Sequence, residues 1–173
     1  QEGLDATCQK IEAQGVKFLG IRADITDYAA LGKAFAKTWE AFGRFDLLVN
    51  SAGTGVMTPF EDLTRDDIDD TIDINLKGTI YSVRQSVPFF ERSGGGNILN
   101  ISSMSAIRGI PDPVNCNGIY TATKFAINGF TECMQKYLLK YNVRVTALCP
   151  GSTATSWWTR WTHSFGTDAM LPP

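Results

Sequence analysis

A tyrosine and a lysine stand four residues apart in the segment Tyr120-Thr-Ala-Thr-Lys124. On a helix, this spacing places the phenol and the ammonium on the same face, one turn apart. A free tyrosine has a pKa near 10, and a fixed cation close by favours the phenolate and lowers that pKa. Bringing it to about 7 takes about 4 kcal/mol of differential stabilisation. A tyrosine tuned in this way can protonate an alkoxide or deprotonate an alcohol, provided that the rest of the chain builds a site around it.

The composition excludes several other classes of function. The chain has 173 residues, a net charge of −2 and 43% apolar residues, so it lacks the basic surface of a protein that binds nucleic acid or an anionic membrane. It contains no apolar run long enough to span a bilayer and no signal-peptide pattern at residues 1–20, so we expect a soluble, cytoplasmic protein. With four cysteines at spacings that do not suit a metal and a single histidine, His163, no metal site is predicted. The glycosylation sequon at Asn100 lies in an apolar run and is interpreted as chance.

Helical and strand-like segments alternate from end to end. Helices are expected at residues 2–14, from Thr26 or Asp27 to Phe42, from Thr64 to Val87 and at 118–140, and strands at 16–23, 45–49, 97–102 and 143–148. The strand at 45–49 has the uniformly apolar composition of one buried on both faces. This alternation predicts an α/β fold with a doubly wound parallel sheet, Rossmann-like with three αβα layers and a single domain. In such sheets ligands bind beyond the carboxyl ends of the strands.

Small and polar residues follow each predicted strand. The four segments concerned are Ala23–Asp27, Asn50–Gly53, Ser102–Ser103 and Pro150–Gly151. Small residues often turn a strand into a loop, so one segment alone would mean little. Four of them at one edge of the sheet predict a ligand site there.

These motifs, in this order, resemble the short-chain dehydrogenase/reductase family from about Gly3 to Thr155. Asn50-Ser-Ala-Gly53 is similar to the family's Asn-Asn-Ala-Gly signature, with serine in place of the second asparagine. The resemblance implies that Asn50, Ala52 and Gly53 line the adenosine side of a bound NAD or NADP. It also implies that Asp24 contacts the adenine ring. The residues matched to the family's Pro-Gly-x-x-x-Thr segment, whose threonine binds the nicotinamide carboxamide, are Pro150, Gly151 and Thr155.

The same resemblance implies a catalytic tetrad of Asn75, Ser103, Tyr120 and Lys124. Ser103 would hold the substrate oxygen beside Tyr120, the general acid or base. Lys124 would lower the tyrosine pKa and bind the nicotinamide ribose, and Asn75 would support a water in the proton relay. The implied function is NAD(P)-dependent interconversion of a small-molecule carbonyl and a secondary alcohol. An epimerase or dehydratase of the same superfamily and a non-catalytic cofactor-sensing protein are the alternatives, and the Asn50–Gly53 and Pro150–Gly151 signatures favour simple oxidoreduction.

The chain also departs from the family pattern. The interval between Ser103 and Tyr120 is longer than usual because of a turn-rich excursion at 111–118. The glycine-rich turn that seats a pyrophosphate is not found in residues 1–173. We therefore expect residues 1–173 to be an internal part of one dinucleotide-binding domain, with strands 3 to 6 and the start of the substrate lid, but without strands 1, 2 and 7. Strands 1 and 2 would lie between 16–23 and 45–49, so this part alone should expose sheet edges and should not form a stable, active domain.

Two aromatic-rich groups allow more than one interpretation. The expected lid contains Trp157, Trp158, Trp161, Phe165 and Met170, which indicate an apolar substrate or a lid that packs on its own core. A second apolar stripe follows the Tyr120 helix: Phe125, Phe130, Met134 and Leu138. By resemblance this stripe predicts a homodimer or homotetramer, and the alternative is the monomer's own core. The choice between NAD and NADP stays open.

Overall fold

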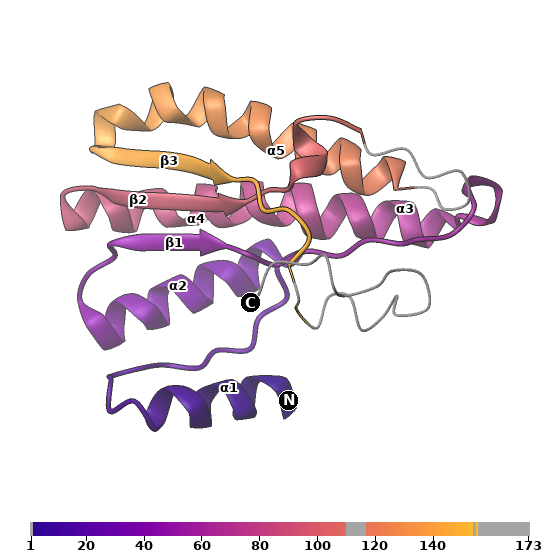
Figure 1. Cartoon of the computed structure of the whole chain (residues 1–173). Coiled ribbons are helices and arrows are strands. Elements are labelled where there is room, and N and C mark those ends of the chain that lie inside the picture. The colour runs from indigo at the N-terminus through magenta and orange to yellow at the C-terminus, as the bar shows by residue number, and fades with distance from the viewer. Residues whose placement is uncertain (1, 110–116, 154, 156–173) are drawn as a thin grey trace.

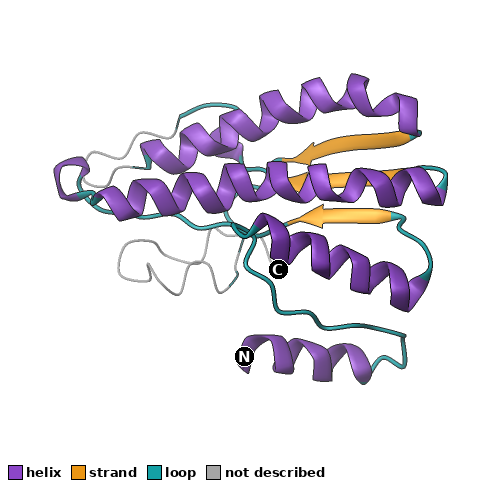
Figure 2. Cartoon of the chain, turned by 180° about the vertical axis from the view of Figure 1, so that it is seen from behind, coloured by secondary structure: helices purple, strands orange, loops and turns teal. Residues whose placement is uncertain are grey.

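The computed structural model describes residues 2–109, 117–153 and 155. Within these ranges the sheet has three parallel strands, β1 (Leu47–Asn50), β2 (Gly96–Ile101) and β3 (Val143–Leu148), in the order β1-β2-β3. Because all three strands run the same way, their carboxyl ends meet at one edge (Figure 1). Helices α2, α4 and α5 lie in front of the strands when the molecule is seen from behind (Figure 2). The Rossmann-like parallel sheet predicted from the sequence is confirmed.

Of the first two helices, the second has the bounds that its sequence signals predict, whereas the first ends at Glu12 and not at residue 14. Helix α1 spans Glu2–Glu12, and α2 spans Tyr28–Phe42. The Asp27 carboxylate caps α2 by accepting hydrogen bonds from the backbone N–H groups of Ala29 and Ala30. Gly43 ends the helix with φ of 70°, a left-handed conformation that glycine adopts without steric cost.

The next helical segment is not the single α-helix that its periodicity predicts. Helix α3 (Arg65–Ile72) starts with a capping box between Thr64 and Asp67. It runs into a π-helical turn at Asp73–Lys77 before α4 (Gly78–Ser93) begins. The wide turn carries Asn75, and π-helical turns of this kind occur often at functional sites.

Helix α5 spans Gly118–Tyr137 and continues into a 3₁₀ turn at Leu138–Tyr141. Its second apolar stripe serves mainly the protein's own core, since Leu138 is buried and both Phe130 and Met134 pack against the core cluster. Only Phe125 of this stripe is exposed. The monomer-core interpretation is therefore confirmed for the other three residues.

The core lies between the sheet and these helices and is rich in aromatic rings. The Phe45 ring meets those of Phe35 and Phe90 edge to face, each pair with centroids 5.3 Å apart. The buried apolar residues of this cluster are Leu31, Phe35, Phe45, Val83, Phe90, Ile98, Leu138, Val143 and Val145. They come from α2, α4, the 3₁₀ turn and the three strands with their flanks, so one cluster joins elements from α2 to β3.

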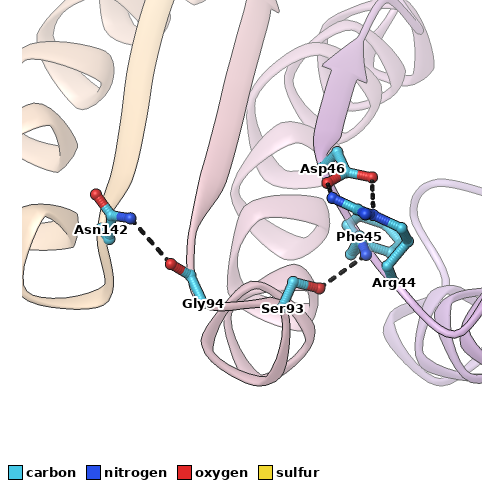
Figure 3. A network of polar contacts seen from close by, with 6 residues as sticks. All are labelled: Arg44, Phe45, Asp46, Ser93, Gly94 and Asn142. Atoms are coloured by element: carbon cyan, nitrogen blue, oxygen red, sulfur yellow. Dashed lines mark hydrogen bonds and ion pairs between the residues drawn. The ribbon is translucent and has the colours of Figure 1, made fainter.

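Hydrogen bonds hold the loops at the amino ends of the strands, opposite the carboxyl edge (Figure 3). The Phe45 backbone N–H donates to Ser93 Oγ at 2.8 Å, and Asn142 Nδ2 donates to the Gly94 carbonyl at 2.9 Å. Arg44 and Asp46 form an exposed ion pair beside them. The two hydrogen bonds tie the carboxyl end of α4 to the residues that lead into β1 and β3.

Two expectations about strands were wrong. Residues 16–23 are not assigned as a strand, and the segment runs beyond α2 from the sheet (Figure 1). A strand needs a hydrogen-bonded neighbour, and among the described residues this segment has none. Strand β1 is not buried on both faces, because Leu47 and Val49 are 56% and 47% exposed. The described helices α2, α4 and α5 lie on one side of the strands only (Figure 1).

The core predicts a large difference between two phenylalanines. Phe90 has 0% exposure, whereas Phe125 is 44% exposed on α5. Phe90→Ala should lower the free energy of unfolding of the intact protein by about 3–5 kcal/mol, because it removes buried surface and leaves a cavity. Phe125→Ala, the matched control, should cost less than about 1 kcal/mol. Urea denaturation followed by circular dichroism measures both, and equal losses would contradict this description of the core.

Candidate active site

Lys124 docks helix α5 onto the carboxyl end of β2. Its Nζ donates a hydrogen bond to the Ile101 carbonyl at 2.8 Å, and its own backbone carbonyl accepts from Ser102 Oγ at 3.3 Å. Lys124 is only 7% exposed. The middle of this helix is therefore fixed at the edge of the sheet where the strand ends gather.

Ser103 and Tyr120 meet beside this lysine. Ser103 follows β2 and caps a 3₁₀ turn at Met104–Ala106, where its Oγ accepts from the Ser105 N–H at 3.1 Å. Its side chain is also hydrogen-bonded to the half-buried Tyr120. The Lys124 Nζ lies 5.5 Å from the centre of the Tyr120 ring. A serine, a tyrosine and a lysine thus converge as the spacing of the motifs requires.

Asn75 joins the same place from the π-helical turn. Its Oδ1 accepts the Thr54 N–H at 2.7 Å, and its Nδ2 donates to the Thr54 carbonyl at 2.9 Å and to Thr123 Oγ1 at 3.1 Å. Gly53 packs closely here, since a Cβ on it would lie 3.4 Å from Asn75 Oδ1 and 3.9 Å from Lys124 Nζ. The turn after β1, the π-helical turn and α5 therefore meet at one amide group.

The candidate cofactor residues occupy the ends of β1 and β3 with different degrees of exposure. Asn50 is buried and donates from Nδ2 to Asn100 Oδ1 at 2.8 Å, whereas Ala52 is exposed. After β3, the Pro150 carbonyl accepts from the Met104 N–H at 2.9 Å, while Gly151 and Thr155 are exposed. Among the described residues, nothing lies within 4 Å of the place where a Cβ on Gly151 would stand. The two segments thus present exposed backbone at the edge where Tyr120 and Lys124 lie.

Asp24 lies in a separate exposed turn before α2. Its Oδ1 accepts hydrogen bonds from the Thr26 N–H at 2.8 Å and from Thr26 Oγ1 at 2.7 Å. These two bonds lower the pKa of the Asp24 carboxyl. Asp24 is thus an exposed carboxylate in a turn, and its contact with an adenine ring stays a prediction.

The electrostatics of the tyrosine differ from the sequence-based expectation. Burial raises the pKa of Tyr120, and the hydrogen bond with Ser103 only partly opposes it. Burial also lowers the pKa of Lys124 to about 8, with a small opposing effect from Cys149. The expected lowering of the tyrosine pKa by Lys124 was therefore wrong for this structure. The lysine directs its ammonium at the Ile101 carbonyl, and burial of the phenol is the main cause of the shift in the tyrosine pKa.

Sequence reasoning missed the polar residues that join these parts. Asn100 is 1% exposed, accepts from Asn50 and donates from Nδ2 to Thr131 Oγ1 at 2.9 Å on α5. This arrangement also agrees with the interpretation of its sequon as chance, because the amide is buried. Thr123 and Thr131 are likewise buried on α5. Their signal in the sequence was a polar residue at a position where the periodicity demands an apolar one.

Some expectations fall outside the described residues. These are most of the excursion at 111–118 and the aromatic lid with Trp157, Trp158, Trp161, Phe165 and Met170. Within the described ranges, no group of three or more metal-ligating side chains is found. In the same part of the chain, no helix is both long and apolar enough to cross a membrane.

Comparison with known proteins gives one consistent result. The family profile described as short chain dehydrogenase matches residues 1–164. Sepiapterin reductase of Chlorobaculum tepidum is 32% identical over 169 residues, which cover 98% of this chain and 68% of that protein.

Two solved structures show the same fold. The apo form of LigO from Sphingobium sp. strain SYK-6 has 38% identity and a TM-score of 0.80, over 87% of this chain and 55% of that one. A short chain dehydrogenase/reductase from Burkholderia phymatum in complex with NAD has 27% identity and a TM-score of 0.84, over 92% of this chain and 57% of that one. The chain thus spans between about half and two thirds of the length of these proteins.

The buried lysine predicts a pH-dependent stability. Its pKa is about 8 in the folded protein and 10.5 in the unfolded chain, so between these values the unfolded state binds more protons and stability rises with pH. Lys124→Met removes this dependence. From pH 7.5 to 9.5 the free energy of unfolding of the intact wild type should rise by about 2 kcal/mol relative to the variant. The raised pKa of Tyr120 acts in the opposite sense only above about pH 10. Urea denaturation at both pH values provides the measurement, and parallel curves would contradict the burial of a charged lysine.

Proposed function

This chain belongs to the short chain dehydrogenase family, and we propose that the protein containing it is an NAD(P)-dependent oxidoreductase that interconverts a carbonyl and a secondary alcohol. One observation carries the proposal: Ser103 is hydrogen-bonded to Tyr120 beside the buried Lys124, at the carboxyl edge of the sheet. Ligands of open α/β sheets bind at this edge. The substrate is a small molecule.

The residues at this edge fit the nicotinamide and ribose side of such a cofactor. The turn after β1 and the segment after β3 offer exposed backbone, and no described residue crowds the position of a Cβ on Gly151. Lys124 supplies a cation near the Asn50–Gly53 turn, as its proximity to Gly53 indicates. When bound, the nicotinamide ring supplies or accepts the hydride. We assign Pro150, Gly151 and Thr155 to the nicotinamide side of the cofactor. Asn50, Ala52 and Gly53 are assigned to its adenosine side, with Asp24 at the adenine ring.

The protein's own side chains would handle the proton and the substrate oxygen. In carbonyl reduction, the hydride forms the new C–H bond, the C=O π electrons move to oxygen, and the Tyr120 hydroxyl protonates that oxygen. Ser103 donates a hydrogen bond to the same oxygen and stabilises the negative charge that develops there. The raised pKa of Tyr120 keeps the phenol protonated at neutral pH, as a general acid requires. In alcohol oxidation, these steps run in reverse.

Lys124 would act on Tyr120 by placing a positive charge beside the phenol, and not by lowering the pKa of the resting phenol. Its own pKa of about 8 leaves it mostly protonated at pH 7, so its charge can stabilise a phenolate formed during turnover. The water expected near Asn75 would complete a proton path from Lys124 to solvent. Assembly as a homodimer or homotetramer belongs to this proposal, and Phe125 is the one exposed member of the α5 stripe available for it.

The proposal predicts that Tyr120→Phe removes most of the turnover and leaves cofactor binding nearly intact. Loss of the proton donor should lower kcat by at least about 100-fold, because positioned acid–base catalysis contributes about 10²–10⁴-fold. Initial rates at 340 nm with NADH and NADPH, over a panel of small aryl and aliphatic ketones, measure kcat. Titration with each coenzyme, followed by tryptophan fluorescence, measures binding.

Tyr137→Phe is the matched control on the same helix. Tyr137 is 57% exposed and pairs with Lys140 instead of with the site residues, so its variant should keep kcat within about twofold of the wild type. Unchanged turnover in Tyr120→Phe would refute the proposed role of the phenol. Absence of binding by either coenzyme to the intact protein would refute the function.

A further inference from the structure

We propose that Thr123 is a positioning residue whose hydroxyl sets the catalytic helix α5 at its working distance from the turn after β1. It acts through Asn75 and touches neither substrate nor cofactor. The inference rests on the function proposed above and adds to it a residue that fixes the geometry of the reaction.

The hydroxyl of Thr123 has a defined direction. Its hydrogen goes to the Tyr120 carbonyl at 2.7 Å, so the oxygen faces Asn75 as an acceptor and receives Nδ2–H at 3.1 Å. Thr123 is 2% exposed, so water does not compete for either bond. One hydroxyl therefore joins the backbone of the catalytic tyrosine to the amide of Asn75.

Asn75 passes this contact to the turn after β1. Its Oδ1 and its other Nδ2 hydrogen hold the N–H and the carbonyl of Thr54, the residue after Gly53. Both amide hydrogens are then in use, and the amide cannot rotate without breaking a bond to one of the two threonines. The side chain of Asn75 thus links Thr54 to Thr123, and the backbone of Asn75 is the third fixed point of this bridge.

This third point, the backbone of Asn75, is anchored in the π-helical turn. The Asn75 carbonyl accepts from Thr79 Oγ1 at 2.8 Å, and Gly78 packs so closely on Ile25 that a Cβ there would lie 2.8 Å from Ile25 Cγ1. Asn75 therefore has little freedom to follow a displaced helix. If the Thr123 hydroxyl is lost, α5 loses its bond to this bridge, while the bond between Asn75 and Thr54 stays intact.

That difference predicts a specific kinetic signature. Thr123→Val keeps the shape of the side chain but removes the hydroxyl, so kcat should fall about tenfold through misplacement of Tyr120. The dissociation constant for NADH or NADPH should change less than threefold, because the turn after β1 stays attached to Asn75. Thr123→Ser restores the hydroxyl and should bring kcat back to within twofold of the wild type.

A double-mutant cycle tests whether Thr123 acts through Asn75. In an Asn75→Ala background, Thr123→Val should lower kcat by less than a further twofold, since the bond it removes is already absent. Circular dichroism and NADH or NADPH titration verify that each variant is folded. Additive losses in the double variant would overturn the proposal.

Thr71→Val is the control for the loss of a buried threonine hydroxyl. Thr71 is also 2% exposed, and its hydroxyl donates only to the Asp67 carbonyl within α3. This variant should lower stability but keep kcat within twofold. Equal loss of kcat in Thr71→Val, a Thr123→Val variant with the turnover of the wild type, or failure of Thr123→Ser to restore activity would each overturn the inference. Tyr120→Phe is measured in parallel, so that its full activity would count against the proposed function and not against Thr123 alone.

Discussion

Lys124 places an ammonium group where only 7% of the residue remains exposed, and it directs that group at the last carbonyl of β2. Lowering its pKa from 10.5 to about 8 corresponds to about 3 kcal/mol against the charged form. The hydrogen bond to Ile101 offsets part of this cost and fixes α5 against the end of the strand. Tyr120 lies one turn before Lys124 on the same helix, so the same contact brings the phenol to Ser103. The candidate site depends on this contact more than on any other.

Around this contact, hydrogen bonds between buried polar side chains hold the elements together, as apolar packing does elsewhere in the protein. One set runs from Asn50 through Asn100 to Thr131, and a second runs from Thr54 through Asn75 to Thr123. Apolar contacts tolerate small shifts, whereas hydrogen bonds have a narrow range of distance and angle. Polar ties at the carboxyl edge therefore fix the relative positions of the strand ends and α5 more tightly than the phenylalanine cluster could. No buried side-chain nitrogen or oxygen of the described residues lacks a partner, so the ties leave no unsatisfied group.

One face of the sheet is partly uncovered in the described part of the chain. Leu47 and Val49 stand exposed on one face of β1, and the segment at 16–23 runs extended without a strand partner in the described part of the chain. Both β1 and the segment at 16–23 contain apolar side chains of the kind that strands bury in a sheet. The chain spans about two thirds of the length of one relative and about half of another.

Some elements of the fold could be predicted from local sequence signals, and others could not. Local signals were sufficient for α2, because the Asp27 cap and Gly43 act within one helical turn. They were sufficient for β3 as well, whose observed range of Val143–Leu148 is the predicted one. The same local signals predicted a strand at 16–23 that is not observed, and they did not indicate the π-helical turn at Asp73–Lys77. A strand forms only beside a hydrogen-bonded partner strand, which local signals do not supply.

The candidate site divides in the same way. The sequence by itself determined the residue types, their order and the spacing of Tyr120 and Lys124, because these follow from the chain and from helix geometry. Only the tertiary structure decided that Ser103 meets Tyr120, that the Asn75 side chain makes three hydrogen bonds to Thr54 and Thr123, and that burial raises the tyrosine pKa in spite of the neighbouring lysine. The reason is that hydrogen bonding between distant residues and the loss of solvent arise only when the strand ends and α5 come together.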